Sequence, residues 1–376
     1  MARNRAAGLW VGRRATEGVE PPAPAFSMQI GRPFASTRYL ITVADRDGRV
    51  IGELWGQLEG VNWRMDGYGQ AALLAPPDLA RDRPWLIEHG NRVLIEFENG
   101  LEPWGGVIDL PRETSAYSAR VQMYQAAYVF NWRLLAQDAH YRGEWSNQAA
   151  HILRSLVYFR GDMNVYAEPI SGEEGPTVDV TFGQEESVAS AAGRLRDLDP
   201  AMHYIVKGRR ENGRIEFYLN AWHGVRRDDS RVVALISGHN FVGATTMEQG
   251  PVFNVIRTAV PGRDAPWTST ESGSVARYGR REEWLTPTGV EEWGPAQAEH
   301  TAHNRLGQVA WPRLRTSGAA LDLPPGRFRD YGVGSVVTLE AERPEARSNP
   351  AFIISMDYTP GDGTLGLVFD DTEERQ

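Results

Sequence analysis

The sequence predicts a mainly β (α+β) protein, and three observations carry that prediction. Short runs rich in β-branched and aromatic residues, separated by turn residues, recur from Met28 to about residue 140. Apolar residues at helical spacing are concentrated in a central block, residues 143–225, and in one later segment. The β pattern then resumes and continues through the C-terminal residues. This order predicts a β domain, an inserted small α/β module, and a further β region that carries one short surface helix.

Length and composition narrow the class of protein. A chain of 376 residues has room for two or three domains, and 41% hydrophobic with 24% charged residues is an ordinary globular composition. The net charge of −9 argues against a protein whose main role is to bind nucleic acid. The absence of cysteine excludes disulfides, thiolate zinc sites and thiol nucleophiles. No run approaches the roughly 18 apolar residues of a membrane span, and no secretory apolar region is expected.

Residues 1–27 are expected to form an arm, because four arginines and three prolines leave little apolar surface to bury. An arm that docks on a neighbouring subunit is the functional alternative. Residues 28–142 are expected to form a β-barrel-like domain, with tight hairpins at Asp47-Gly48 and Asn99-Gly100. Its predicted strands are Tyr39–Ala44, Arg49–Trp55, Val61–Tyr68, Arg92–Phe97, Leu101–Leu110 and a long, bent Tyr117–Leu135.

Residues 143–225 are expected to form the inserted α/β domain. Ser146 is a candidate N-cap for a first helix, and a second helix is predicted to end at Asp199-Pro200. A hairpin is expected at Asn212-Gly213. The predicted elements are helices over Ala149–Val157 and Glu185–Leu198, and strands over Thr177–Phe182, Met202–Val206 and Arg214–Leu219.

Residues 226–325 are expected to form part of a second β domain with a loop and a helix, and residues 326–376 to complete it. The stretch from Gly250 to Trp284 is interpreted as the return of the chain into the large β structure, starting with a strand over Val252–Val260. The helix from Pro295 to Val309 has a thin apolar face, which favours a surface or an interface. Further predicted strands are Arg231–Ile236, Ser335–Leu339, Ala351–Tyr358 and Leu365–Phe369.

Candidate catalytic and metal-binding groups each have a plainer explanation. His300 and His303, preceded by Glu299, share a helix face and could bind a metal, but the zinc-hydrolase pattern needs histidines four apart. The triplet Ser237-Gly238-His239 lacks the elbow of a serine hydrolase, and Lys207 is expected to be a surface charge beside the third hairpin. Paired acids that could serve a glycosidase are expected to be exposed loops and helix starts: Glu173-Glu174, Glu185-Glu186, Glu282-Glu283 and Glu291-Glu292.

Three arginine pairs lie next to acids, and mixed-sign clusters of this kind favour ion-paired surfaces between subunits over phosphate binding. The pairs are Arg209-Arg210 with Glu211, Arg226-Arg227 with Asp228-Asp229, and Arg280-Arg281 with Glu282-Glu283. Core and interface packing is the expected use of the tryptophans in and beside the first β domain: Trp55, Trp63, Trp85, Trp104, Trp132 and Trp145. No catalytic, cofactor-binding or metal-binding residue is therefore predicted.

Several segments resemble the tail hub (tail-associated, baseplate hub) proteins of tailed bacteriophages. They are Asn254–Arg257 followed by Ser274–Glu282, Leu86–Val93 after Trp63-Arg64, the Ser187-Val188-Ala189 helix leading to Tyr204-Ile205-Val206, and Gly334-Ser335-Val336-Val337. The resemblance covers about residues 28–370 and rests on order more than on any single motif. It implies two β-barrel domains related to tail-tube subunits, and a homotrimer.

The resemblance implies a structural protein of the virion tail tip, assembled in the host cytoplasm, that is not an enzyme and needs no cofactor. Implied partners are a tail-tube ring or distal tail protein, a spike or tail fibre, the C-terminus of the tape-measure protein, and DNA passing through a lumen. The hub would adapt six-fold to three-fold symmetry. Two alternatives remain open: a carbohydrate-binding or carbohydrate-active β protein, and another tail component such as a distal tail or spike protein.

Overall fold

The computed structural model describes residues 38–114, 118–141, 148–167, 175–225, 227–228, 230, 232–249, 252–260, 263, 265–285, 295–340 and 349–371. The predicted arm, residues 1–27, and the predicted cap Ser146 lie outside these residues. Within the described chain, no helix is both long and apolar enough to cross a membrane.

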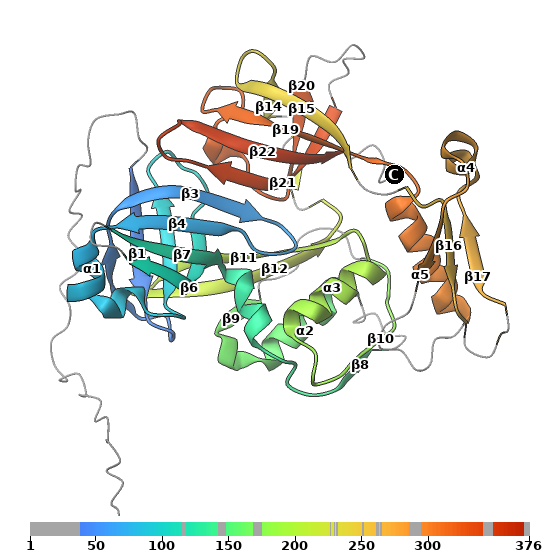
Figure 1. Cartoon of the computed structure of the whole chain (residues 1–376), viewed down its shortest axis with the longest axis horizontal. Coiled ribbons are helices and arrows are strands. Elements are labelled where there is room, and N and C mark those ends of the chain that lie inside the picture. The colour runs from blue at the N-terminus through green and yellow to red at the C-terminus, as the bar shows by residue number, and fades with distance from the viewer. Residues whose placement is uncertain are drawn as a thin grey trace, which may run out of the picture. The chain divides into compact units, whose positions relative to one another are not determined.

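Fourteen of the strands in the described residues form one large sheet. Its first half, residues 39–125, is called here the first lobe (Figure 1). Its strands follow the order β3-β4-β7-β6-β5-β1-β2, all antiparallel. A short helix α1 (Pro77–Asp82) and a 3₁₀ helix (Pro84–Ile87) connect β4 to β5. The strands are β1 (Tyr39–Ala44), β2 (Val50–Leu54), β3 (Gln57–Arg64), β4 (Gln70–Ala75), β5 (Arg92–Phe97), β6 (Trp104–Thr114) and β7 (Ala119–Gln125).

The second lobe contains the other half of the sheet, in the order β15-β19-β22-β21-β20, with β13 and β14 parallel to β20. Strand β21 joins the lobes: its first half pairs with β20, and Ser355–Tyr358 pair with Val61–Arg64 of β3. A bulge between Ile353 and Ser355 separates the two pairings. The strands are β13 (Arg227–Asp228), β14 (Ala234–Ile236), β15 (Phe241–Gln249), β19 (Arg313–Leu321), β20 (Ser335–Glu340), β21 (Asn349–Tyr358) and β22 (Thr364–Asp371).

One hydrophobic core serves both lobes. Four aromatic rings cross the junction in sequence: Trp63 to Phe97 with centroids 5.6 Å apart, Phe97 to Tyr358 at 5.5 Å, and Tyr358 to Phe328 at 6.3 Å. Phe328 lies in a 3₁₀ helix (Phe328–Asp330) of the second lobe. Because buried aromatic rings contribute the largest apolar areas to a core, this row fixes one lobe on the other.

The inserted α/β domain, called here the first module, packs its two helices on a three-stranded sheet, β11-β12-β9 (Figure 1). Its core also includes Ala44, Leu94 and Val107 from strands of the first lobe. The hairpin between β11 and β12 turns at Asn212 (φ 50°) and Gly213 (φ 74°), as expected for this dipeptide. The elements are a 3₁₀ helix (Ala126–Trp132), β8 (Ala139–Tyr141), α2 (Ala149–Phe159), a 3₁₀ helix (Gly161–Met163), β9 (Val165–Ala167), β10 (Val180–Phe182), α3 (Val188–Leu198), β11 (Met202–Glu211) and β12 (Arg214–His223).

Residues 252–311 form a second module between β15 and β19, with a sheet of its own in the order β17-β16-β18. The predicted strand Val252–Val260 therefore does not rejoin the large sheet: its regular part, β16 (Val255–Thr258), belongs to this small sheet. Helix α5 (Pro295–Val309) buries Ala302 and Leu306 against Ile256. The other elements are β17 (Trp267–Thr270), α4 (Ser272–Tyr278) and β18 (Glu282–Leu285).

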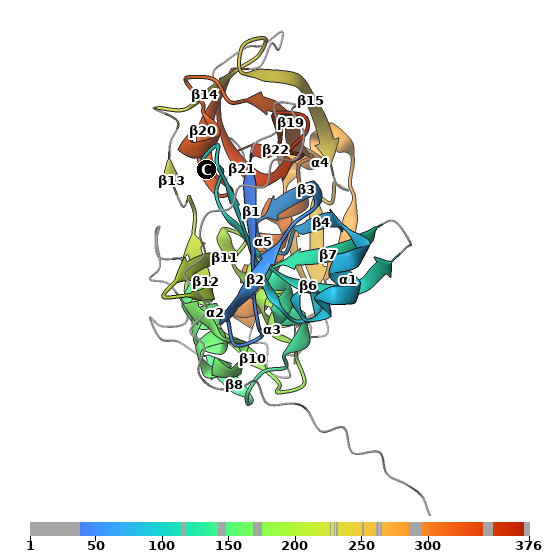
Figure 2. The ribbon, with the colours of Figure 1, turned by 90° about the vertical axis from the view of Figure 1, so that its left-hand side faces the viewer.

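The mainly β class with an inserted α/β module is confirmed. Among the described strands the main path of pairing ends at β2 and β15, and β20 with β13 and β14 branches from β21, so the closure of each half into a barrel stays a prediction. Figure 2 labels the two end strands. The predicted bend in Tyr117–Leu135 is real, because β7 gives way to a 3₁₀ helix at Ala126.

Candidate functional site

The structure offers a set of anchoring contacts between its lobes and modules, and the first is centred on Asp66. This residue occupies the β3–β4 turn with φ 59°. Its buried carboxylate accepts hydrogen bonds from His203 Nδ1 (2.8 Å) and from the Tyr204 backbone N–H (2.8 Å), and forms an ion pair with Arg196 (3.2 Å). The His203 ring lies 5.3 Å from that of Phe352 in the second lobe. The turn of the first lobe is therefore held by the first module at the point where the second lobe meets both.

Arg92 forms the second anchor. This arginine of β5 is only 4% exposed, and burial lowers the pKa of its guanidinium. It donates to four backbone carbonyl oxygens: Ile215 (3.1 Å), Asn164 (3.3 Å), Met163 (3.4 Å) and Arg46 (3.2 Å). Its guanidinium carbon lies 4.7 Å from the centre of the Phe217 ring. One charged group thus satisfies acceptors of both the first lobe and the first module.

A glycine pair allows β6 of the first lobe to touch β11 of the first module. A Cβ atom built on Gly105 would lie 2.5 Å from the Cα and the backbone nitrogen of Gly208. Beside this contact Lys207 forms an ion pair with Glu102 of the first lobe. Lys207 was predicted to be a surface charge; instead its side chain is 24% exposed and ties the module to the lobe.

The second module is organised by Asn254, which is fully buried. Its side-chain nitrogen donates to the Gly279 carbonyl (2.7 Å), and its side-chain oxygen accepts from the Arg281 backbone N–H (2.8 Å). Ser274 Oγ donates to the carbonyl oxygen of Ala310 at the end of α5. The two segments that carry the family resemblance, Asn254–Arg257 and Ser274–Glu282, are therefore in direct contact.

We expect Asn254→Ala to lower the free energy of unfolding by about 2 kcal/mol, because it removes both hydrogen bonds of a fully buried amide, to the Gly279 carbonyl and from the Arg281 N–H. Denaturant titration followed by tryptophan fluorescence measures the change. Asn131→Ala, at an exposed position of the first module, is the matched control and should leave the midpoint unchanged. Equal effects of the two substitutions would contradict the anchoring role of Asn254.

Helices α3 and α5 bring the two modules together. Asn304 of α5 donates to the Leu198 carbonyl at the end of α3 (2.7 Å). Arg305 forms a bidentate pair with Glu283 of β18 (2.8 and 2.7 Å). Burial raises the pKa of the Asp197 carboxyl on α3, and the positive charge of Arg305 opposes that rise. The predicted thin apolar face of α5 thus packs inside its own module, while polar residues of the helix reach the first module.

The histidine pair of α5 lies on the exposed side of the helix. Glu299, His300 and His303 are all exposed, and Asn304 donates to His300 Nε2 (3.1 Å). In the part of the chain that the structure describes, no three histidine, aspartate or glutamate side chains are grouped as a metal would require. His239, of the triplet weighed for hydrolase chemistry, is in hydrogen-bond contact with the Pro324 carbonyl (3.0 Å).

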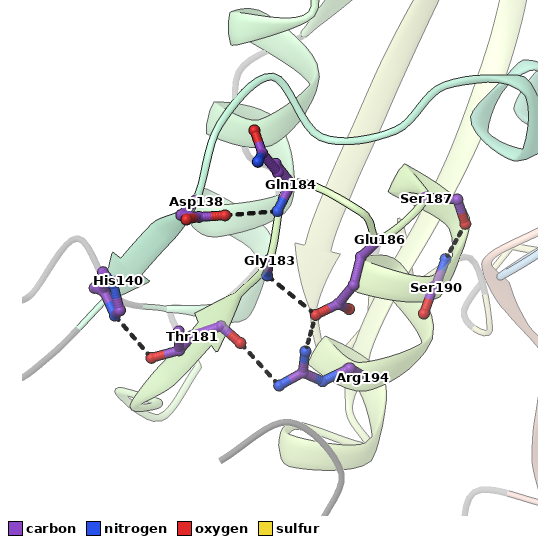
Figure 3. A network of polar contacts seen from close by, with 9 residues as sticks. All are labelled: Asp138, His140, Thr181, Gly183, Gln184, Glu186, Ser187, Ser190 and Arg194. Atoms are coloured by element: carbon purple, nitrogen blue, oxygen red, sulfur yellow. Dashed lines mark hydrogen bonds and ion pairs between the residues drawn. The ribbon is translucent and has the colours of Figure 1, made fainter. Parts of the chain in front are cut away.

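Three of the paired acids, Glu186, Glu282 and Glu283, form ion pairs within the chain, and Figure 3 shows the contacts around Glu186. Glu186 pairs with Arg194 of α3, which also donates to the Thr181 carbonyl (2.9 Å). Ser187 caps α3 by accepting from the Ser190 N–H (3.1 Å), and Asp138 accepts from the Gln184 N–H (2.7 Å). Glu282 pairs with Arg280 (2.6 Å) and Arg257 (3.5 Å). Glu173-Glu174 and Glu291-Glu292 lie outside the described residues.

Some of the arginine pairs and tryptophans considered in the sequence lie within the described residues. Arg209 pairs with Glu211 (2.9 Å) and lies over the Tyr218 ring (3.5 Å), so this cluster is ion-paired within one chain. The side chains of residues 226–229, and Trp145, lie outside the described residues. Trp63 and Trp104 are core residues, whereas Trp55 and Trp85 are exposed.

The anchors Asp66, Arg92 and Gly105 were not singled out from the sequence. Arg92 occupies an ordinary position at the start of a predicted strand, and only its long-range partners reveal its role. Asp66-Gly67 is a turn dipeptide, which locates a hairpin but not the histidine that contacts it.

Together these contacts define a class: a β scaffold of two lobes with two attached α/β modules. No protein-family model matches the chain, and no curated protein matches it at a significant level. Solved structures do share its fold. They include a tail protein from Neisseria meningitidis MC58 (TM-score 0.59, 14% identity, 89% of this chain and 97% of that chain) and the 43 kDa tail protein of prophage MuSo2 from Shewanella oneidensis (TM-score 0.56, 12% identity, 89% and 98%).

A third similar structure is the prophage tail protein gp18 from Listeria monocytogenes EGD-e (TM-score 0.52, 11% identity, 90% and 95%). The likeness covers nearly the whole of each chain, lobes and modules together. The chain therefore has the fold of phage tail proteins, and the resemblance noted in the sequence is confirmed at the level of the fold.

Proposed function

We propose that the chain is a structural hub protein at the tip of a phage or phage-like tail, and that it is not an enzyme. The observation that carries this proposal is the architecture: two β lobes share one sheet through β21 and β3 and one core, in a fold that tail proteins share over about nine-tenths of the chain. The anchors support it, because they use buried polar groups to hold parts together and not to meet a substrate.

Three copies of a two-lobe chain would present six β lobes, which suits contact with a six-fold tube on one side and a three-fold spike or fibre on the other. We propose this homotrimer as the adaptor between a tail-tube ring or distal tail protein and a spike or fibre. Its lumen would receive the C-terminus of the tape-measure protein and then let DNA pass. The net charge of −9 supports a lumen wall past which DNA moves without binding.

Strand β15 is the surface we propose for contact between copies. It ends the path of the large sheet, with β19 as its one hydrogen-bonded strand among those described. From Val242 to Met247 its six residues are exposed on both faces, and Val242 is 39% and Met247 52% exposed. An edge strand with apolar side chains and an open row of backbone groups is a template for pairing with another chain.

Met247→Arg is expected to weaken association of the copies by about tenfold or more, because a charge is then brought into an apolar contact. Sedimentation over a concentration series measures the shift toward monomer. Tyr158→Arg places the same charge at a residue that is 75% exposed on α2 and should leave association unchanged. Unaltered association of the Met247 variant would remove β15 from the interface.

The hub proposal is tested by locating the chain in a tail particle. A reconstruction by electron cryomicroscopy should show three copies closing the end of the tube. Six copies in a ring along the tube would identify a distal tail protein, and copies confined to a fibre would identify a spike component; either result would overturn the hub.

A further inference from the structure

A shallow groove of about 310 Å³ lies on the outer face of the sheet where the lobes meet. Strands β3, β4 and β7 of the first lobe and the end of β21 line it. Its polar side chains meet across strands: Arg120 with Glu59 (2.7 Å), Gln122 with Gln70 (3.5 Å) and Asn62 with Asp357 (2.7 Å). The groove thus presents amide, carboxylate and guanidinium groups in a small area, with a formal charge of −1 from Arg120, Glu59 and Asp357.

A ridge of five rings runs from the first lobe, with Tyr68, His89 and Tyr124, onto the 3₁₀ helix of the first module, with Tyr128 and Trp132. Tyr124 and Tyr128 stack with centroids 4.4 Å apart, and Tyr68 meets Tyr128 edge-on at 4.8 Å. The row continues from Tyr128 to Trp132 (5.4 Å) and from Trp132 to His89 (5.2 Å). Tyr68 is 37% exposed, so the ridge reaches solvent.

Asp109 contacts two rings of the ridge, His89 and Tyr128, and affects the protonation of Tyr128. His89 Nδ1 lies 2.7 Å from the Asp109 carboxylate. Burial, followed by a hydrogen bond to Asp109, raises the pKa of Tyr128 to about 12. The Tyr128 hydroxyl therefore stays protonated at neutral pH. The five rings therefore form an aromatic surface that Asp109 braces through Tyr128 and His89.

The groove and the ridge form one continuous surface. Gln70 of the groove is the cross-strand partner of Tyr124 of the ridge. Gln122 and Tyr124 are two apart on β7, so they point to the same face of the sheet. Tyr68 precedes Gln70 by two residues at the start of β4. A ligand that extends beyond the groove past Gln70 and Gln122 would therefore meet Tyr124 and Tyr68 next.

We propose that this surface binds a neutral oligosaccharide. A sugar ring has an apolar face of C–H groups and a rim of hydroxyls. The apolar face gains by covering an exposed aromatic ring such as Tyr68, and the hydroxyls match the amides and carboxylates of the groove. Sites of this kind combine aromatic walls with a few placed polar groups, and a volume of a few hundred Å³ holds two or three sugar rings.

The same features disfavour other ligands. A formal charge of −1 and a single arginine, already paired with Glu59, do not suit a nucleic acid or another polyanion. A stable protein interface buries on the order of 800 Å² on each partner. Its centre usually contains few charged residues, whereas the groove contains Glu59, Arg120 and Asp357. Binding of sugar does not depend on the hub proposal, because it uses only the groove of one chain.

Isothermal titration calorimetry of the full chain tests the proposal with three probes. Two are neutral oligosaccharides, the β-1,4-linked tetramer of N-acetylglucosamine and maltotetraose; heparin serves as the polyanion. We expect at least one neutral probe to bind and heparin not to bind. Tyr68→Ala and Gln122→Ala should each weaken binding about tenfold, and Tyr68→Phe should retain it because the ring remains.

Tyr158→Ala is the matched control, since Tyr158 is an exposed tyrosine of α2 distant in sequence from the groove. Thermal unfolding of each variant checks that the fold is intact. Failure of both neutral probes to bind the wild type overturns the proposal. So does equal loss in Tyr158→Ala, preferential binding of heparin, or a change of oligomeric mass in Tyr68→Ala, which would make the ridge a contact between proteins.

Discussion

Arg92→Met is expected to lower the free energy of unfolding by about 3 kcal/mol or more, because up to four backbone carbonyls lose a charged donor in a buried setting. Methionine keeps most of the hydrocarbon volume, so the loss reports on hydrogen bonds and not on a cavity. The Phe217 ring also loses its contact with the guanidinium. Denaturant unfolding with circular dichroism measures the change.

Arg81→Met provides the control for this experiment. Arg81 is exposed on α1 and pairs only with Asp78 and Asp82 at the surface, so its replacement should leave the unfolding midpoint unchanged. If Arg92→Met unfolds at the same denaturant concentration as the wild type, Arg92 does not fasten the first module to the first lobe. Arg92→Lys should also be destabilised, because one ammonium group cannot reproduce the spread of a planar guanidinium.

Gly105→Ala is the second substitution with a large expected effect. Its Cβ would lie 2.5 Å from the backbone of Gly208, and backbone atoms cannot move aside as a flexible side chain can. We expect a loss of about 3 kcal/mol, at the upper end for overpacking, because β6 and β11 must separate. Thermal unfolding of the purified variant measures it.

Gly193→Ala is the glycine control, because Gly193 lies inside α3 with open space where its Cβ would go. That change should stabilise the helix by about 0.5–1 kcal/mol. Opposite signs at the two positions are the expected pattern. A neutral Gly105→Ala would show that the lobe and the module are not in backbone contact.

Local structure was largely predictable from the sequence. The strand Arg92–Phe97 has the predicted bounds, since Gly90 precedes its apolar run and the Asn99-Gly100 turn follows it. The helix that ends at Leu198 was also found, although it begins at Val188 and not at Glu185. Its cap is Ser187, and Glu186 before it pairs with Arg194 on α3 and is not part of the helix.

Long-range pairing was not predictable, because the alternation of a strand does not say which sheet it joins. Val255–Thr258 has the pattern of a strand in the large sheet, yet it lies in a small sheet with β17 and β18. Strand β21 pairs with both β20 and β3, a consequence of its length and its bulge that no local pattern displays. For the same reason contacts such as Arg92 to Ile215 and Asp66 to His203, which join residues more than 100 positions apart, are visible only in the fold.

The central claim is that this chain works through shape and copy number. Native mass spectrometry of the purified full chain tests it most directly, because it counts subunits without assuming a partner. The account predicts a dominant species of three 41.9 kDa chains. A dominant monomer at protein concentrations at which a stable trimer would be fully assembled would contradict it. A dominant ring of six chains would contradict it too.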